Sequence, residues 1–422
     1  MSPVRTSRPG RKVHPVDREL HARLDELQRD PYPHYARARA AEGLTYVPEL
    51  DSWLVVRDAD VREVLRRPED FSSANALRPD VMPAPAALAV LAGGFGGRPV
   101  VVTADGDPHQ ALRAPIVRGL SPARVGAVLP YAAERAAALL DGFEKDGRVE
   151  LMAAYAGKLP GDVIGRLVGF DPADVPALVH GGHRLEELLF RPLTEAEQIA
   201  AAEDVVAMSH RVDAFVRARR AAPREDLVTD LITSVAGPGD DELTLDQRHE
   251  LVAHLQNLLI AGHLTTTALI GTTLLHLLRH PRQWELLCAH PDRIPAAIEE
   301  AARYDTALQG FRRVTTRAVT LAGTELPAGT PVFLAFGGAN RDGSRHPDPD
   351  DFDITRTAAA RHLSFGLGVH ACPGSTLARE QLRITLELLT RRMPGLRLAD
   401  DQRIVMRTTL IHRSPETLEL VW

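Results

Sequence analysis

A single cysteine lies in a glycine-rich stretch whose spacing is suited to holding one thiolate. Cys372 occurs in the segment FGLGVHACPG, residues 365–374, and a run with the composition of a helix start follows it at once. The glycines at 366, 368 and 374 allow the backbone to turn tightly and to approach a flat partner closely. Because a helix N-terminus favours negative charge, this placement favours the thiolate form of Cys372. Such a thiolate could be a nucleophile, a redox centre or a metal ligand, and a buried core cysteine is the structural alternative.

The pattern around Cys372 distinguishes among these roles. The arrangement Phe-x-x-Gly-x-His-x-Cys-x-Gly resembles the haem-ligand loop of the cytochrome P450 family. In that family the axial cysteine donates electron density to the iron and favours O–O cleavage. The resemblance implies haem b as the cofactor, Cys372 as its metal ligand, and haem contacts from Phe365, His370 and Gly374. It covers nearly the whole chain from about residue 30, because further segments match the family in the same order.

A Glu-x-x-Arg pair, Glu300 and Arg303, is one of these segments. On a helix, side chains at i and i+3 face each other. Taken alone, such a pair is usually an exposed contact that adds little stability. The resemblance implies instead that Glu300, Arg303 and Arg356 form a buried ion network, a structural lock behind the haem.

A His-x-x-x-Arg pair, His109 and Arg113, is another matching segment, and Arg313 and His370 follow later in the chain. The resemblance implies that these four residues bind the two haem propionates. Two carboxylates near a low-dielectric core need fixed cationic or hydrogen-bonding partners, and guanidinium groups can provide such contacts bidentately. Taken alone, His109 would more often be an ordinary surface histidine.

The segment AGHLTT, residues 261–266, resembles the oxygen-binding part of the family's long central helix. The resemblance implies a haem contact at Ala261 and room for dioxygen at Gly262, where a side chain is missing. The Thr265 hydroxyl can bond to bound oxygen or to a chain carbonyl, which opens a local groove for water. A small-residue contact between helices is the alternative for Gly262.

Two positions depart from the family pattern. The residue before the threonine is usually Asp or Glu, but here it is Leu264, which cannot carry a proton to oxygen as a carboxylate does. Leu264 is therefore a catalytic position at which the proton route is expected to differ. Pro373 follows the cysteine and lacks a backbone N–H, so we expect fewer hydrogen bonds to the sulfur and a more electron-rich thiolate.

Residues that line the substrate pocket in the family are carried over by position. Most are apolar, which favours a largely apolar substrate held by few polar contacts, with Gln309 and His412 as candidates for those contacts. The predicted lining residues are Phe95, Val101, Val102, Leu258, Ala261, Leu264, Thr265, Leu308, Gln309, Phe311, Leu410, Ile411 and His412.

The elements that must position these residues are mostly helices. Hydrophobic periodicity predicts helices over 32–42, 58–67, much of 107–234, and a long apolar helix over about 245–280 that must cross the core. Breaks are expected at Gly142, Pro160-Gly161, Pro172 and Pro192. Residues 74–102 are predicted to be a long functional or mobile loop. Strands are predicted at 44–47, 52–56, 319–321, 332–335 and 418–422.

The expected fold class is therefore mainly α. The resemblance implies the cytochrome P450 fold, a helix-rich triangular body with small β-sheets at one side. A flexible N-terminal tail over residues 1–25 and a single haem-thiolate domain over residues 26–422 are expected.

Composition excludes several other classes. With 56 acidic and 50 basic residues and a formal charge of −6, the chain lacks the footprint of a nucleic-acid binder. Its two cysteines, Cys288 and Cys372, do not form the pattern of a disulfide scaffold, which favours a cytoplasmic location. We see no apolar signal core and no stretch long enough to span a bilayer, so no membrane association is expected.

These observations predict a haem-thiolate monooxygenase that inserts oxygen into a small hydrophobic or natural-product substrate. Dioxygen and electrons from a ferredoxin and its NAD(P)H-dependent ferredoxin reductase are the expected co-reactants. Because Leu264 replaces the acid, the alternative is a haem-thiolate enzyme with peroxide-driven oxidation, oxidative coupling or desaturation. A haem sensor without turnover is a third reading, and the presence of Thr265 argues against it.

Overall fold

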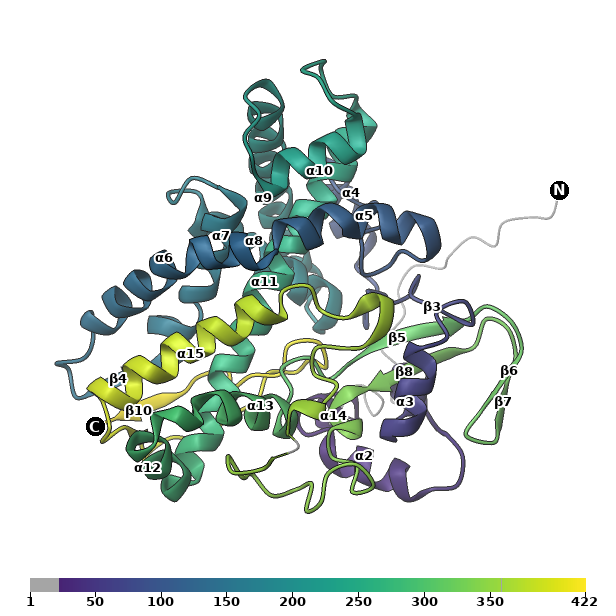
Figure 1. Cartoon of the computed structure of the whole chain (residues 1–422). Helices are drawn as coiled ribbons and strands as arrows, with labels where there is room; N and C mark the ends of the chain where they lie inside the picture. Colours follow the sequence, from purple (N-terminus) through teal and green to yellow (C-terminus); the bar gives the residue numbers. More distant parts are fainter. Residues whose placement is uncertain (1–22, 358) are drawn as a thin grey trace.

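Helices form most of the computed structural model, which describes residues 23–357 and 359–422 and has a roughly triangular outline (Figure 1). The predicted N-terminal tail, residues 1–25, lies outside the described residues as far as residue 22. Residues 23–29 are helical, and Leu24 and Leu27 are buried there. Residues 23–25, which were predicted to belong to the flexible tail, are therefore helical.

The long helix α11, Leu245–Arg279, runs through the middle of the protein (Figure 1). A capping box begins it: the Thr244 hydroxyl accepts from the Gln247 N–H, and the Gln247 side chain accepts from the Thr244 N–H. By length and composition α11 is the one described helix that could cross a membrane, but 72% of its most apolar window is buried inside the protein. The predicted helix that crosses the core is confirmed.

The remaining helices surround α11. Pro160 does not break a helix as predicted; it lies in the first turn of α7, where its missing N–H costs no helical hydrogen bond. Within the predicted loop over 74–102, residues 85–91 form a short helix. The bounds are α2 Tyr32–Ala40, α3 Asp58–Leu65, α4 Pro85–Leu91, α5 Gly106–Gly119, α6 Pro122–Asp141, α7 Leu159–Val168, α8 Val175–Phe190, α9 Glu195–Ala221, α10 Leu227–Ala236, α12 Pro281–Ala289, α13 Ile294–Tyr304, α14 Phe336–Ala339 and α15 Ser375–Arg392.

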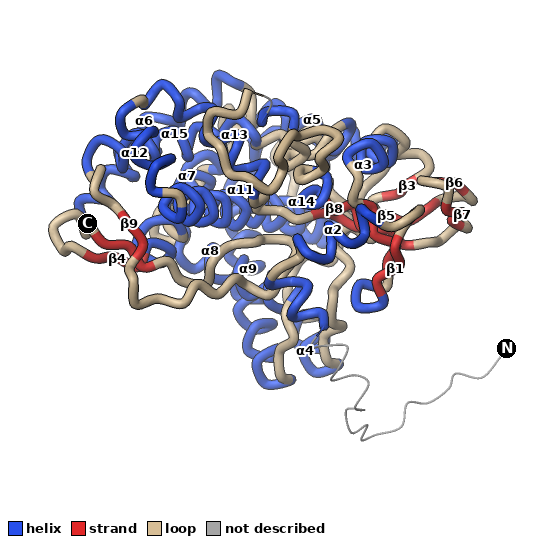
Figure 2. The backbone as a smooth tube through the Cα atoms, turned by 90° about the horizontal axis from the view of Figure 1, so that it is seen from below, coloured by secondary structure: helices blue, strands red, loops and turns tan. Residues whose placement is uncertain are grey.

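The described strands form three small sheets that lie at two ends of the molecule (Figure 2). The five-stranded sheet has the order β1-β2-β8-β5-β3, with β1 Thr45–Val47, β2 Ser52–Val55, β8 Pro331–Ala335, β5 Gly310–Thr315 and β3 Phe71–Ser72. The hairpin of β6, Val319–Leu321, and β7, Thr324–Leu326, lies at the same end. The sheet of β4 Arg148–Glu150, β10 Glu419–Val421 and β9 Arg397–Leu398 lies at the other end, so the sheets do not all lie at one side as expected.

Strand β5 was not predicted, although it carries two residues of the site. Two adjacent arginines, Arg312 and Arg313, interrupt the alternation of apolar side chains that identifies a strand in sequence. Pairing with β8 fixes the register, with Phe311 opposite Leu334 and Arg313 opposite Val332. Because side chains alternate along a strand, Phe311 and Arg313 share one face, and both line the central cavity.

Candidate active site

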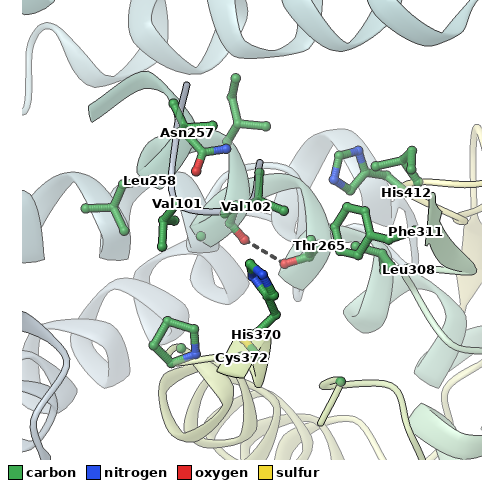
Figure 3. A pocket seen from close by; sticks show the side chains of 18 of the residues that line it. Val101, Val102, Asn257, Leu258, Thr265, Leu308, Phe311, His370, Cys372 and His412 are labelled. Atoms are coloured by element: carbon green, nitrogen blue, oxygen red, sulfur yellow. Dashed lines mark hydrogen bonds between the residues drawn. The ribbon is translucent and has the colours of Figure 1, made fainter. Parts of the chain in front are cut away.

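A cavity of about 510 Å³ lies between α11 and the loop that carries Cys372 (Figure 3). Its wall is drawn from α5, α8, α11, β5 and α15 and from the segments 97–102, 306–308, 364–374 and 411–412. Most of the lining side chains are apolar. A largely apolar cavity of this size suits the binding of a small organic molecule or of a flat cofactor.

The loop before α15 presents the Cys372 side chain to this cavity. Gly366 and Gly368 have φ angles of 68° and 71°, and a Cβ atom on Gly368 would come within 2.7 Å of the Leu65 carbonyl oxygen. The loop closes on itself through hydrogen bonds from the Cys372 N–H to the Phe365 carbonyl, 2.8 Å, and from the Ala371 N–H to the Gly368 carbonyl, 3.0 Å. The predicted tight glycine turn is confirmed at residues 366 and 368.

Cys372 is exposed to the cavity, but desolvation by the surrounding protein raises the pKa of its thiol, while backbone N–H groups of Gly374 and Ser375 and the charge of Arg113 oppose this effect. The predicted bias toward the thiolate is therefore outweighed by desolvation in the protein alone. A bound metal ion reverses this balance, because a coordinating thiol is deprotonated. The sulfur is thus suited to a metal more than to service as a free nucleophile.

Replacing Pro373 with leucine is expected to shift the reduction potential of the haem-loaded protein to a more positive value. The change adds a backbone N–H beside a sulfur that Gly374 and Ser375 already approach, and hydrogen bonds to a ligating sulfur reduce its electron donation. Spectroelectrochemical titration measures the shift. Pro373→Ala adds the same N–H with less bulk and should shift the potential in the same direction; an unchanged or more negative value would contradict this account.

Four polar residues gather beside the cysteine loop, as the resemblance implied. The rings of His109 and His370 lie 4.2 Å apart between centroids, and His370 Nε2 lies 2.9 Å from the Ser73 hydroxyl. Arg113 donates to the Ala371 carbonyl at 2.5 Å, and Arg313 donates to the Arg312 carbonyl at 2.8 Å. His109 is buried, contrary to the expectation for a histidine of this kind taken alone, and its Nε2 has no hydrogen-bond partner in the described residues.

This cluster has more positive than negative charge: the carboxylate that acts on it is Asp105, which accepts a hydrogen bond from the Ser73 N–H. Burial lowers the pKa of Arg313 to about 10, and burial followed by the nearby charge of Arg313 lowers the pKa of His370 to about 3. No salt bridge joins Arg113 or Arg313 to an acid within the described part of the chain. Arg113, which is half-buried, Arg313, which is buried, and His370 all line the cavity, whereas His109 lies behind them and does not line it. Two guanidinium groups without salt bridges fit a ligand that brings its own carboxylates, as haem does.

Replacing Arg313 with glutamine is expected to weaken haem retention by about 10- to 100-fold, since a hydrogen bond to a charged group contributes about 1.5 to 3 kcal/mol. The rate of haem transfer to excess apomyoglobin measures the effect. Arg317→Gln, just beyond the end of the same strand and largely exposed, is the matched control. Equal transfer rates in the two variants would show that Arg313 does not hold the cofactor.

On α11, the cavity face is made by residues one helical turn apart. Leu258, Ala261, Gly262 and Thr265 all line the cavity, and the Thr265 hydroxyl donates to the Ala261 carbonyl at 2.7 Å (Figure 3). A Cβ atom on Gly262 would lie 2.7 Å from Ile164 Cγ1 of α7. Gly262 therefore lets α11 and α7 pack closely, which was the alternative to the oxygen role, and room for dioxygen at Gly262 stays a prediction.

Leu264 does not line the cavity, which corrects its prediction as a lining residue. Its exposed fraction is 3%, because one residue advances a helix by about 100° and turns this side chain away from the face that presents Thr265. An acid at this position would have to reach the cavity from the buried flank of α11. That Leu264 changes the proton route stays a prediction.

Three further residues do not contribute to the cavity wall as predicted. Gln309 is fully buried and donates to the Tyr32 hydroxyl, 3.1 Å, and to the Thr306 carbonyl, 2.8 Å. Leu410 packs into a separate core cluster that includes Phe333. Phe95 packs against Arg248, whose guanidinium carbon lies 4.7 Å from the centroid of the Phe95 ring. Gln309 and Leu410 are each next in sequence to a residue that does line the cavity, Leu308 and Ile411, but their own side chains do not line it. The predicted residues that do line the cavity are Val101, Val102, Leu258, Ala261, Thr265, Leu308, Phe311, Ile411 and His412.

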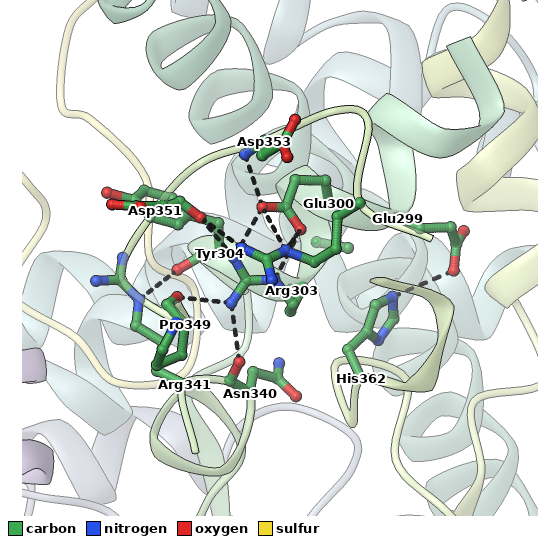
Figure 4. Close-up of polar contacts among 12 residues, drawn as sticks. Glu299, Glu300, Arg303, Tyr304, Asn340, Arg341, Pro349, Asp351, Asp353 and His362 are labelled. Atoms are coloured by element: carbon green, nitrogen blue, oxygen red, sulfur yellow. Dashed lines mark hydrogen bonds and ion pairs between the residues drawn. The ribbon is translucent and has the colours of Figure 1, made fainter. Parts of the chain in front are cut away.

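The Glu300–Arg303 pair is fully buried, both side chains having 0% exposure, and is held by two hydrogen bonds of 2.7 and 2.8 Å (Figure 4). Arg356 lies 3.2 Å from the same carboxylate, and the Asp353 N–H donates to it at 2.9 Å. Arg303 also donates to the carbonyls of Asn340, Pro349 and Asp351. The predicted buried network of three residues is present.

Sequence reasoning missed the residues that connect this network to the cysteine loop. The Asn340 side chain donates to Ser364 Oγ at 2.9 Å and accepts from the Leu363 N–H at 2.6 Å, while Ser364 Oγ donates to the Ala302 carbonyl at 2.6 Å. Asn340 and Ser364 lie in segments that carry no motif of their own. Through them the ion network fixes the segment that leads into Phe365.

A second acid on α13, Glu299, holds the other side of the loop. Burial would raise the pKa of Glu299, but hydrogen bonds from His362 and Arg379 lower it to about 2. Arg379 donates to Glu299 at 2.5 and 2.9 Å, and its guanidinium lies 4.3 Å from the Phe365 ring centroid. The cysteine loop is thus clamped between α13 and α15.

The cavity wall also contains polar residues that the sequence did not reveal. Glu186 on α8 and Gln256 and Asn257 on α11 all line the cavity. The only signal for Glu186 was an acid on the apolar flank of an amphipathic helix, next to Leu185. Matching positions of the family do not identify such a residue, because the side chains that line the pocket vary with the substrate.

Comparison with known proteins gives a consistent result. The family model described as Cytochrome P450 matches residues 294–407. Cytochrome P450 144 of Mycobacterium tuberculosis is 34% identical over 379 residues, covering 89% of this chain and 85% of the relative. The vitamin D(3) 25-hydroxylase of Pseudonocardia autotrophica is 33% identical over 397 residues, covering 92% of this chain and 94% of that protein.

Solved structures agree over nearly the whole length. The P450 heme domain of Tepidiphilus thermophilus superposes with a TM-score of 0.86 at 29% identity, covering 94% of each chain. The similarity therefore extends from the cysteine loop, where the family model matches, to the helices and sheets on every side of the cavity.

Proposed function

The chain belongs to the cytochrome P450 family of haem-binding oxidoreductases, and on that premise we propose that it is a monooxygenase acting on a small, largely apolar substrate. One observation carries the proposal: a lone thiol and a threonine hydroxyl line the same apolar cavity, beside Arg113 and Arg313, which make no salt bridge to an acid within the described residues. When bound, haem would supply a thiolate-ligated iron able to activate dioxygen.

The residues of the chain would do the rest of the work by position. Cys372 would hold the metal, and His109, Arg113, Arg313 and His370 would hold the propionates. Thr265 keeps its proton at Oγ1, directed to the Ala261 carbonyl at 2.7 Å, and its oxygen can accept a hydrogen bond from water in the cavity. The apolar walls would exclude other water and favour a substrate that is itself mostly hydrocarbon.

The same premise supports a proposal for the electron donor and for the cellular location of the protein. Family members use redox partners, and for this chain we favour a small ferredoxin with an NAD(P)H-dependent reductase in the cytoplasm. The vitamin D(3) 25-hydroxylase is a relative named for a hydroxylation, which supports the proposed type of reaction. Peroxide-driven oxidation, coupling or desaturation is the second candidate, because Leu264 provides no acid beside Thr265.

A turnover assay on apolar probes separates these functions. It compares a surrogate ferredoxin system plus NADPH with hydrogen peroxide, in wild type, Leu264→Glu and the matched uncharged variant Leu264→Gln. Oxygenated product from the ferredoxin system in wild type supports the monooxygenase. Product with peroxide alone, or ferredoxin-driven product in Leu264→Glu but not in Leu264→Gln, supports the second candidate, and no substrate-dependent electron consumption in any variant supports a sensor.

A further inference from the structure

A buried acid and a histidine meet in the cavity wall at a place that the proposed chemistry does not use. Glu186 of α8 and His412 of the C-terminal segment both line the cavity, with exposed side-chain fractions of 2% and 8%. Their neighbours in the wall include Leu185, Leu189 and Phe311. Buried polar groups in an apolar wall are costly unless they are paired, so the pair requires an explanation.

The pair is tightly arranged. His412 Nδ1 lies 2.8 Å from Glu186 Oε1, and Arg407 Nη2 lies 3.4 Å from Glu186 Oε2. Burial alone would raise the pKa of Glu186, but His412, Arg407 and His183, in that order, lower it to about 2. The carboxylate is therefore ionised near neutral pH and can only accept hydrogen bonds.

The ionised acid determines which nitrogen of His412 carries hydrogen. Nδ1 faces an acceptor and must be the N–H donor. The Arg407 guanidinium also lies against this carboxylate, so the acid has a cationic partner when the His412 ring carries only the Nδ1 proton. In that state Nε2 carries a lone pair and accepts a hydrogen bond.

Nε2 is left without a partner in the protein. No hydrogen bond joins Nε2 to any other residue in the described ranges, and the protein does not fully enclose this nitrogen. Figure 3 shows His412 with Phe311 and Leu308 on one side of the cavity and Val101 on the other. The free lone pair thus belongs to a group in the wall of the cavity that receives the substrate.

We propose that the Glu186–His412 pair is a specificity site that binds a hydroxyl group of an otherwise apolar substrate, the hydroxyl donating to His412 Nε2. The inference rests on the proposed function and specifies its substrate class. A carboxylate is disfavoured because it would meet the Nε2 lone pair and the nearby charge of Glu186. A saturated hydrocarbon or an ether would leave Nε2 without a donor, which is unfavourable in a buried site.

Calorimetric binding of matched probes to the haem-loaded protein tests this proposal. Decan-1-ol should bind about five- to tenfold more tightly than its methyl ether, which keeps the oxygen but has no O–H to donate, and more tightly than decanoate. In Glu186→Gln the amide can donate to Nδ1, so His412 can exchange its tautomer and the preference for the alcohol should fall toward unity. His412→Phe keeps a flat ring without nitrogen and should have the same effect.

Glu187→Gln, on the same helix but paired with Arg184 and Arg191, is the matched control and should keep the preference. Equal affinities for alcohol and ether in wild type, tighter binding of decanoate, or an unchanged preference in Glu186→Gln would each overturn the proposal. Thermal melting shows whether each variant folds. If His412→Phe does not fold, Glu186→Gln alone tests the proposal. Loss of the proposed enzyme function would appear separately, as the absence of a thiolate-type spectrum in wild type.

Discussion

Replacing Glu300 with alanine is expected to lower the free energy of unfolding by about 3 to 5 kcal/mol, the cost of removing one partner of a buried ion pair. Both Glu300 and Arg303 have no exposed surface, so the Arg303 guanidinium would lose its two carboxylate contacts inside the core. Arg356 and the Asp353 N–H would lose the same acceptor. Urea denaturation followed by circular dichroism measures the change.

The same variant is expected to lose haem as well as stability. Arg303 donates to the Asn340 carbonyl, and the Asn340 side chain holds Leu363 and Ser364 at the entrance to the cysteine loop. Glu387→Ala on α15 removes an exposed ion pair with Arg383 and should cost about 0.5 kcal/mol or less. If Glu300→Ala loses no more stability than Glu387→Ala, or keeps a full complement of haem, the network is not the support of the loop.

The sequence predicted those parts of the fold in which a local pattern is decisive. The apolar run of α11 and the glycine turns before Cys372 are both local features, and both are present. Strand β5 was missed because Arg312 and Arg313 are adjacent, and its arginines are tolerated only because one faces the cavity and the other pairs with Asp80. That outcome depends on tertiary contacts that no local pattern contains.

The site was predictable to the extent that it depends on motif spacing. The cysteine loop and the pairs Glu300–Arg303 and His109–Arg113 are motifs of fixed spacing, whereas the resemblance to the family added Arg356 to the ion network and Arg313 and His370 to the cationic cluster. The cavity wall was only partly predicted, since Leu264 and Gln309 are neighbours of lining residues and face into the core. Glu186 lies 226 residues from His412 in sequence, so only the folded chain brings the two together.

Replacing Cys372 with serine is expected to abolish the red-shifted Soret band that reduced protein shows with carbon monoxide when a thiolate ligates the haem. Cys372 is the one sulfur residue in the cavity wall within the described part of the chain, so no other thiolate can take its place. The serine hydroxyl is nearly the same size but ionises far less readily than a thiol, so it cannot replace the thiolate as an electron donor.

Cys288→Ser is the matched control for this change. Cys288 is the other cysteine of the chain, and it lies on α12, outside the cavity wall, where burial raises the pKa of its thiol. This variant should therefore keep the red-shifted band and the haem content of wild type. Because the loop backbone is held by Gly366, Gly368 and the Phe365 carbonyl, Cys372→Ser should still fold. A red-shifted band that persists in Cys372→Ser, or one that disappears in Cys288→Ser, would place the metal ligand elsewhere and remove the basis of the proposed chemistry.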